Sequence, residues 1–376
     1  MRGWTLRLMR VASPFSRTRV ETGQALAGLL AGSWRQPPHE NPALSNQLLS
    51  RLAPAVTSGG GSGLAWFRIR QSGKDLSPSV LRVYHEAYIS LVATAAAHEA
   101  DLERLSNALC AANIRFVLLK GWSVGRLYPE SGLRPSGDID LWIDPQQRPA
   151  AEAILRDLAL TRAVDLEHDQ LARFEDRGFA EFYALCDTVQ LGSTAVKILR
   201  PEDQVRILCL HFLKHGGWRP LWLCDIAILL ESERGTFDWK VCLGANHRRE
   251  YWIGSTIALA RELLEARIPA GAPYPVTSSP PKWLVGTVLW EWGDPRPPST
   301  PAFAVLLPSL WHQPWQVKTL LRGRWRNSIQ ATTDCDGGFI ATWPRWVYQA
   351  RDAVARATRF CLKTRLLRKQ ISSFTR

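Results

Sequence analysis

The order of apolar and polar positions along the chain predicts an α/β core. Apolar residues recur at helical spacing between residues 79 and 112, which predicts one long helix. Short apolar runs at 116–119 and 138–143 predict two strands, with a short helix over 121–127 between them. A further helix is expected over 148–158, after Pro145 ends the second strand. This alternation of strands and helices indicates a small sheet with helices packed on it.

More strands and then only helices are expected in the rest of the chain. Residues 179–185 alternate well enough to predict a strand, and 188–191 with 195–199 predict a hairpin. Residues 161–178 are polar and predict no element. Helices are predicted from Pro201 onward, over 201–214, 221–230, 251–266 and 348–369. We therefore expect an α/β (α+β) fold with a small mixed sheet and flanking helices, followed by a mainly helical C-terminal region.

Glycine and proline content suggests three parts. Residues 1–76 form an N-terminal extension, in which the Gly/Ser-rich stretch 58–63 predicts a flexible linker. Residues 77–200 form the α/β core. Residues 201–376 form the mainly helical region, which is rich in Trp and Arg.

Charge and cysteine content narrow the class of partner and the compartment. The 376 residues carry a formal net charge of +13 with a pI near 9.8, which favours anionic partners such as nucleotides, nucleic acid or an acidic membrane surface. The seven cysteines include no CxxC pair, which argues against a zinc site of the usual spacing. No secretory signal and no uncharged run of the ~18–20 residues that span a bilayer are seen. We expect a cytoplasmic protein without a transmembrane segment.

Asp138 and Asp140 are the first candidate site residues. Successive side chains of a strand point to opposite faces, so two residues that are two apart share one face. Ile139 and Leu141 then point into the core. Two carboxylates on one face repel each other, and a divalent cation such as Mg²⁺ would relieve that repulsion. The pattern therefore predicts a metal site on this strand.

Two segments of the chain resemble a known family. The first reads LLKGWSVGRLYPESGLRPSGDIDLWI and covers the two predicted strands with the turn between them. The second reads RPEDQVRILCLHFLKHGGWRPLWLCDIAILL and covers residues 200–230. Over about 115–243 the chain resembles the nucleotidyltransferases of the DNA polymerase β superfamily. In particular it resembles an uncharacterised bacterial branch with the pattern LKG…LYP…R…DIDLLV, and this implies the nucleotidyltransferase fold.

The resemblance implies an Mg²⁺-dependent enzyme that moves an NMP group from an NTP to a hydroxyl-bearing acceptor. The acceptor would be a small molecule, a peptide or a protein. Asp138 and Asp140 would hold two Mg²⁺ ions, with Mn²⁺ as an alternative, and pyrophosphate would leave. A third carboxylate on a later strand would complete one metal and help to deprotonate the acceptor. Glu181 is our choice for it, and Asp187 and Glu167 are the alternatives.

The turn after the first strand would bind the triphosphate. Gly121 and Ser123 would contact the phosphates, and Lys120 and Arg134 would be their charge partners. The chain departs from the family pattern here, because Trp122 stands where a small residue is usual and Ser123 comes one place late.

Two other functions stay open on the sequence. One is a catalytically degenerate member that serves as a binding module in a biosynthetic or regulatory assembly. The other, less favoured, is a nucleic-acid or membrane-surface protein in which the Asp pair is incidental. Separately, Asp225 lies in an apolar helix and needs a partner, for which His211, His215 and Arg219 are candidates.

Overall fold

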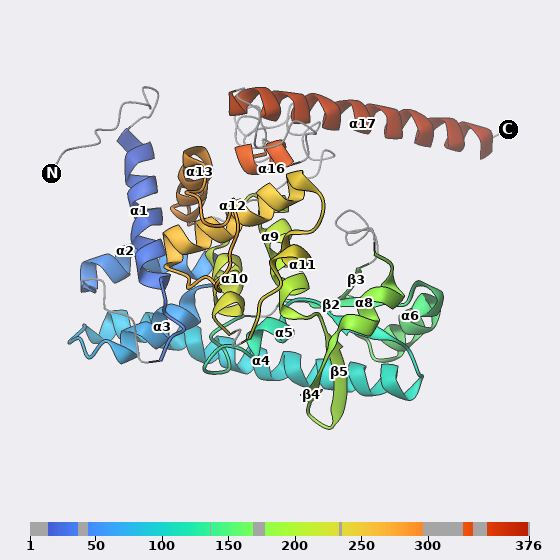
Figure 1. The fold of residues 1–376 in the computed structure, drawn as a ribbon, viewed down its shortest axis with the longest axis horizontal. Coiled ribbons are helices and arrows are strands. Elements are labelled where there is room, and N and C mark those ends of the chain that lie inside the picture. Colours follow the sequence, from blue (N-terminus) through green and yellow to red (C-terminus); the bar gives the residue numbers. More distant parts are fainter. Residues whose placement is uncertain are drawn as a thin grey trace. The chain divides into compact units, whose positions relative to one another are not determined.

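Figure 1 shows the fold in a computed structural model, which describes residues 14–36, 44–135, 137–167, 177–232, 235–295, 326–333 and 344–374. The chain forms two compact units. One consists of residues up to 211 together with 219–295, and the other of 212–218 together with the residues from 296 onward. The three-part division expected from the sequence, with boundaries near residues 76 and 200, stays a prediction.

The first unit contains a mixed five-stranded sheet. Its strands are β1 (Phe116–Leu118), β2 (Ile139–Ile143), β3 (Val164–Glu167), β4 (Asp187–Leu191) and β5 (Thr194–Ile198), in the order β3-β2-β1-β5-β4. β2 runs parallel to β3 and β1 parallel to β5, whereas the other two pairs are antiparallel. The mixed α/β architecture predicted from the sequence is confirmed.

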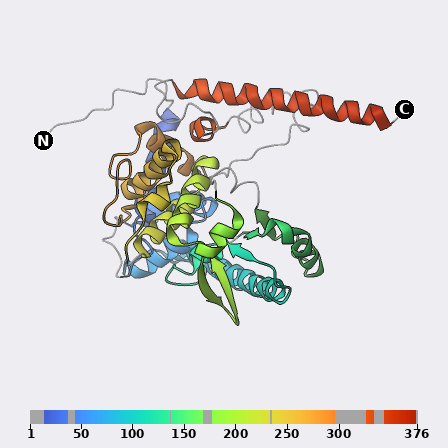
Figure 2. The same cartoon turned by 45° about the vertical axis from the view of Figure 1, so that its right-hand side comes forward.

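Alternate residues of β2 face two different hydrophobic clusters. Ile139, Leu141 and Ile143 pack with apolar residues of α4 (Pro78–Ala111) and α6 (Arg148–Asp157). Trp142 points the other way, toward α8 (Phe179–Leu185) and α9 (Pro201–Lys214). α4 runs along the sheet in both views (Figure 1, Figure 2). Because residues two apart share a face, Asp138 and Asp140 lie on the same face as Trp142.

The first unit contains a further set of helices. They are α1 (Pro14–Leu30), α2 (Asn46–Ser58), α3 (Ser62–Gln71), α5 (Trp122–Gly125), α10 (Pro220–Ser232), α11 (Trp239–Leu243), α12 (His247–Leu264) and α13 (Lys282–Trp292), with a 3-10 turn at Pro145–Gln147. The second unit contains α16 (Ser328–Thr333) and the basic helix α17 (Arg345–Phe374). Of the helices in the described residues, none is long and apolar enough to cross a membrane.

Residues 179–185 form a helix, α8, and the strand predicted there is wrong. The three aromatic residues Phe179, Phe182 and Tyr183 are spaced by three and four, which places them on one side of a helix. Phe179 and Phe182 are buried, and both rings contact Trp142 edge-on, with centroids 5.3 and 5.0 Å away. Packing on Trp142 therefore decides the helical conformation.

The stretch 58–63 is a buried turn between α2 and α3, and not a flexible linker. Gly59 to Gly63 are all buried, and the backbone N–H of Gly59 donates to Ala55. Gly60 has φ +76°, a conformation that L side chains rarely adopt. The glycines allow the backbone to pack closely, and a glycine-rich composition does not mean flexibility at this position.

The C-terminal region was expected to be rich in Trp. Its Trp-containing stretch 311–315 lies outside the described residues.

Candidate metal centre

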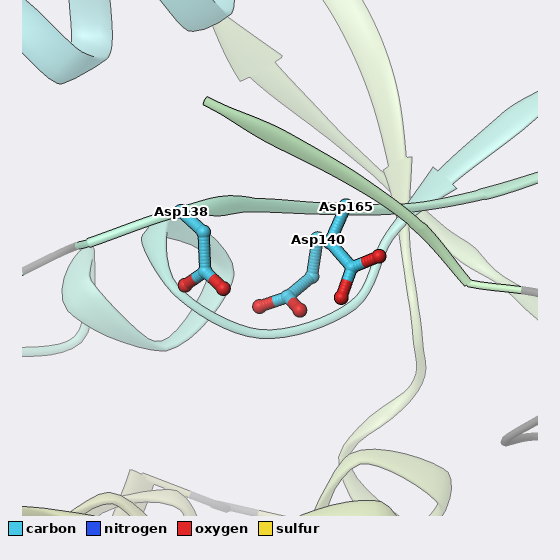
Figure 3. Close-up of side chains that lie close together, drawn as sticks. All are labelled: Asp138, Asp140 and Asp165. Atoms are coloured by element: carbon cyan, nitrogen blue, oxygen red, sulfur yellow. The ribbon is translucent and has the colours of Figure 1, made fainter. Parts of the chain in front are cut away.

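Three carboxylates from two neighbouring strands meet on one side of the sheet (Figure 3). Asp138 directly precedes β2, Asp140 lies on β2, and Asp165 lies on β3. One ligand oxygen of each lies within 4.8 Å of those of the other two. Hard divalent cations such as Mg²⁺ and Mn²⁺ prefer carboxylate oxygens, so this donor set fits such an ion.

Strand register places Asp165 at the site. In the parallel pairing of β2 with β3, Asp140 is opposite Asp165. Val164 and Leu166 pack against the cluster of α4 and α6, so the alternating side chain of Asp165 points to the other face. The pattern Val-Asp-Leu-Glu at 164–167 is the sequence signal that would have predicted this strand and its carboxylate.

One of the three carboxylates is paired with a lysine. The Nζ atom of Lys120 lies 2.9 Å from Oδ1 of Asp140, and the two side chains are only 11% and 7% exposed. Asp138 and Asp165 are exposed to solvent. Two unit charges 4.8 Å apart repel by about 3 kcal/mol at an effective dielectric constant of about 20, and by less where water screens them. A single lysine offsets part of this repulsion, and a bound cation would offset the rest.

Gly121 and Ser123 shape the turn that carries Lys120. Gly121 has φ +63° and ψ −114°, which favours glycine. The hydroxyl of Ser123 is fully buried and lies within hydrogen-bond distance of the Leu119 and Lys120 carbonyls, 3.1 and 3.2 Å away. The buried side-chain amide of Gln204 donates to both Ser123 and the Leu119 carbonyl. Ser123 thus holds the turn from inside, and its hydroxyl does not face solvent.

Trp122 is directed away from the carboxylates. Its indole Nε1 donates to Glu99 of α4 at 3.2 Å, and its ring packs against the hydrophobic cluster between the sheet and α4. Asp138 and Asp140 lie on the opposite face of the sheet. The Trp122 side chain therefore packs between the sheet and α4, on the face opposite to the carboxylates.

Arg134 is engaged in a buried ion pair with Asp225 of α10. Its Nε and Nη2 atoms donate to the two carboxylate oxygens, each at 3.0 Å, and the Tyr128 hydroxyl donates to Oδ1 at 2.9 Å. Asp225 is completely buried. Burial by itself would lower the pKa of Arg134, but the Asp225 carboxylate outweighs it and the pKa is raised. Asp225 is thus paired with Arg134 and Tyr128, which the sequence had not suggested.

Of the three carboxylates proposed from the sequence for the third position, Glu181 and Asp187 lie outside the group formed by Asp138, Asp140 and Asp165. Glu181 is exposed in the first turn of α8, and Asp187 is exposed at the start of β4. Glu167 is on β3, where its backbone pairs with Trp142. The group of carboxylates that the described side chains bring together contains Asp165 and neither Glu181 nor Asp187.

The chain belongs to a family described as uncharacterised nucleotidyltransferase, whose sequence pattern matches residues 49–264, more than half of the chain. Among solved structures, an antigenic nucleotidyltransferase-like protein from Paracoccidioides brasiliensis is 16% identical and covers 47% of this chain and 96% of its own, with a TM-score of 0.36. No curated protein sequence matches the chain.

Proposed function

We propose that the protein transfers an NMP group from an NTP to a hydroxyl-bearing acceptor, using divalent cations held by Asp138, Asp140 and Asp165. The gathering of these three carboxylates within 4.8 Å is the observation that carries the proposal. Membership of the nucleotidyltransferase family supports the reaction class. Two Mg²⁺ or Mn²⁺ ions, when bound, would stabilise the attacking and leaving oxygens of such a displacement.

The reaction forms one bond and breaks one. The acceptor hydroxyl oxygen bonds to the α-phosphorus, and the bond from that phosphorus to the oxygen bridging to the β-phosphate breaks, so pyrophosphate leaves. Asp165 is exposed at the open edge strand and is our candidate to take the hydroxyl proton. Asp140 is buried and would serve as a metal ligand.

Three residues of the turn after β1, together with Arg134, have supporting roles in this proposal. Lys120 balances the charge of Asp140 and orients its carboxylate through their 2.9 Å ion pair. Gly121 and Ser123 keep Lys120 in place through the conformation of the turn and the buried hydroxyl. Arg134 fixes the segment before Asp138 to α10 through Asp225. The sequence-based expectation that these residues contact phosphates directly stays a prediction.

Calorimetric titration of each NTP with Mg²⁺ and with Mn²⁺ tests the proposal. We expect binding that requires the metal and that is lost in Asp140→Asn. Asp187→Asn is the matched control, since Asp187 is exposed on β4 and is not a member of the carboxylate group. Absence of NTP binding with either metal would overturn the proposal. Metal-dependent binding without pyrophosphate release would instead favour the non-catalytic binding module.

A further inference from the structure

Arg219, directly before α10, forms no direct ion pair with a carboxylate of the described residues. Its Nε atom is buried and has no hydrogen-bond partner. Its guanidinium lies near the ring of Trp222, whose centroid is 5.8 Å from Cζ. The residue is half-buried, and a buried N–H group of a cation without an acceptor costs stability. Such a residue is expected where an anion binds.

The glycine-rich turn between α2 and α3 is built around this residue. A Cβ atom on Gly60 would lie 2.7 Å from an amino nitrogen of Arg219, and one on Gly59 would lie 2.8 Å from Cδ of Pro220. Any side chain at Gly60 would displace the guanidinium. The guanidinium of Arg219 therefore packs directly on the backbone of this turn, and glycine at positions 59 and 60 leaves the space for Arg219 and Pro220.

The same turn connects Arg219 to the carboxylate site. A Cβ atom on Gly63 would lie 2.5 Å from the carbonyl oxygen of Gly132, so the start of α3 packs on the segment that leads through Arg134 to Asp138. α10, which follows Arg219, carries the Asp225 partner of Arg134. Burial and the charge of Arg134 lower the pKa of Arg219, whereas Asp225 and Asp138 raise it. Arg219 therefore lies within electrostatic reach of the candidate metal centre.

We propose that Arg219 binds the β- and γ-phosphates of the nucleotide and retains pyrophosphate as it leaves. This inference rests on the proposed function of the carboxylate site. A guanidinium offers a planar set of donors that matches phosphate oxygens, and Nε would gain the acceptor that it lacks. Two N–H groups of Arg134 already donate to Asp225. Arg219 is therefore better suited than Arg134 to bind the phosphates.

Titration of the full chain with Mg²⁺ and NTP, NMP or pyrophosphate tests the proposal. We expect Arg219→Gln to weaken binding of NTP and pyrophosphate at least tenfold and to leave NMP binding unchanged. Arg219→Lys keeps the charge but not the planar fork, and should bind at an intermediate strength. Arg82→Gln is the matched control, because Arg82 is exposed on α4.

The outcomes separate this proposal from the proposed function. If the wild type binds NTP and Arg219→Gln binds it equally well, the role of Arg219 is overturned and the proposed function stands. If the wild type binds pyrophosphate through Arg219 but no NTP, the phosphate site stands and the proposed function fails. Binding of neither overturns both. A melting temperature of Arg219→Gln at or above that of the wild type supports a binding role, and a marked drop would indicate a structural one.

Discussion

Asp140 and Asp165 lie opposite each other in the parallel pairing of β2 with β3, and both point to the face of the sheet that Asp138 shares. Pairing two acids side by side opposes folding of the sheet unless a cation is present. Lys120 supplies one positive charge, at 2.9 Å from Asp140. The clustering of three carboxylates, of which only Asp140 is shown in an ion pair with Lys120, is the physical basis for the proposed metal site.

Replacement of Asp165 should weaken metal binding far more than replacement of Glu181. Asp165→Asn removes one of three clustered oxygen ligands, so we expect the Mn²⁺ affinity to fall by at least about tenfold, the loss typical of perturbing even an outer-shell partner. Glu181→Gln should change it little, because Glu181 is exposed on α8. Titration followed by electron paramagnetic resonance of free Mn²⁺ measures both. An equal loss in the two variants would contradict the assignment.

Loss of the lysine in the site should make stability depend on metal. Lys120→Met leaves Asp140 buried without its partner, and we expect the free energy of unfolding to fall by about 2–4 kcal/mol without metal. Saturating Mg²⁺ should restore more stability to Lys120→Met than it adds to the wild type, because the ion replaces the missing charge. Urea unfolding with and without Mg²⁺ measures this. If Mg²⁺ does not restore the stability of Lys120→Met, the proposal that Lys120 and Mg²⁺ both offset the charge of the carboxylates is contradicted.

Breaking the buried Arg134–Asp225 ion pair should mainly lower the free energy of unfolding. Asp225→Ala leaves a buried guanidinium uncompensated, so we expect a loss of about 3–5 kcal/mol. Tyr128→Phe removes one hydrogen bond to Asp225 and should cost about 1–2 kcal/mol. Asp101→Asn, at an exposed ion pair on α4, is the control and should change stability by less than about 1 kcal/mol. Thermal unfolding compares them, and a small effect of Asp225→Ala would contradict the buried pair.

The ionised carboxylate of Glu231 should stabilise the fold near neutral pH, and this stabilisation should be lost in acid. Burial would raise the pKa of Glu231, but hydrogen bonds from Arg35 and from the backbone N–H of Arg267 outweigh it and lower the pKa below the ordinary 4.5. A lowered folded-state pKa contributes stability above pH 4.5 that is lost as the pH falls through the folded value.

The variant Glu231→Gln tests this sign. We expect it to be less stable than the wild type near neutral pH, with a difference that shrinks as the pH falls below about 4.5. Urea midpoints between pH 3 and 7 measure the difference. A difference that stays constant over that range would contradict the ion pair.

Local sequence patterns predicted four of the five strands, but not β3, which carries Asp165 of the candidate metal centre. Periodicity identified β2 with Asp138 and Asp140, and turn spacing identified the hairpin of β4 and β5. β3 was missed because its two core contacts, Val164 and Leu166, gave too short a signal among polar neighbours. α8 was read as a strand because its partner, Trp142, is distant in the chain. In both cases, tertiary packing decides the local structure.

The charge partners were equally hard to predict from the sequence. Lys120 and Asp140 are joined by the antiparallel pairing of β1 with β2, and Arg134 and Asp225 lie 91 residues apart. Sequence reasoning could require a partner for Asp225 but could not choose among distant cations. The cytoplasmic location and the nature of the acceptor stay predictions.

Counting Mn²⁺ ions bound with a non-hydrolysable NTP analogue tests the central claim most directly. We expect two Mn²⁺ per chain, spin-coupled in electron paramagnetic resonance because two-metal sites hold their ions about 3.5–4 Å apart. Asp140→Asn should lose the coupled signal, and Asp187→Asn should retain it. Fewer than two bound ions in the wild type, or a coupled pair that survives Asp140→Asn, would contradict two-metal catalysis at Asp138, Asp140 and Asp165.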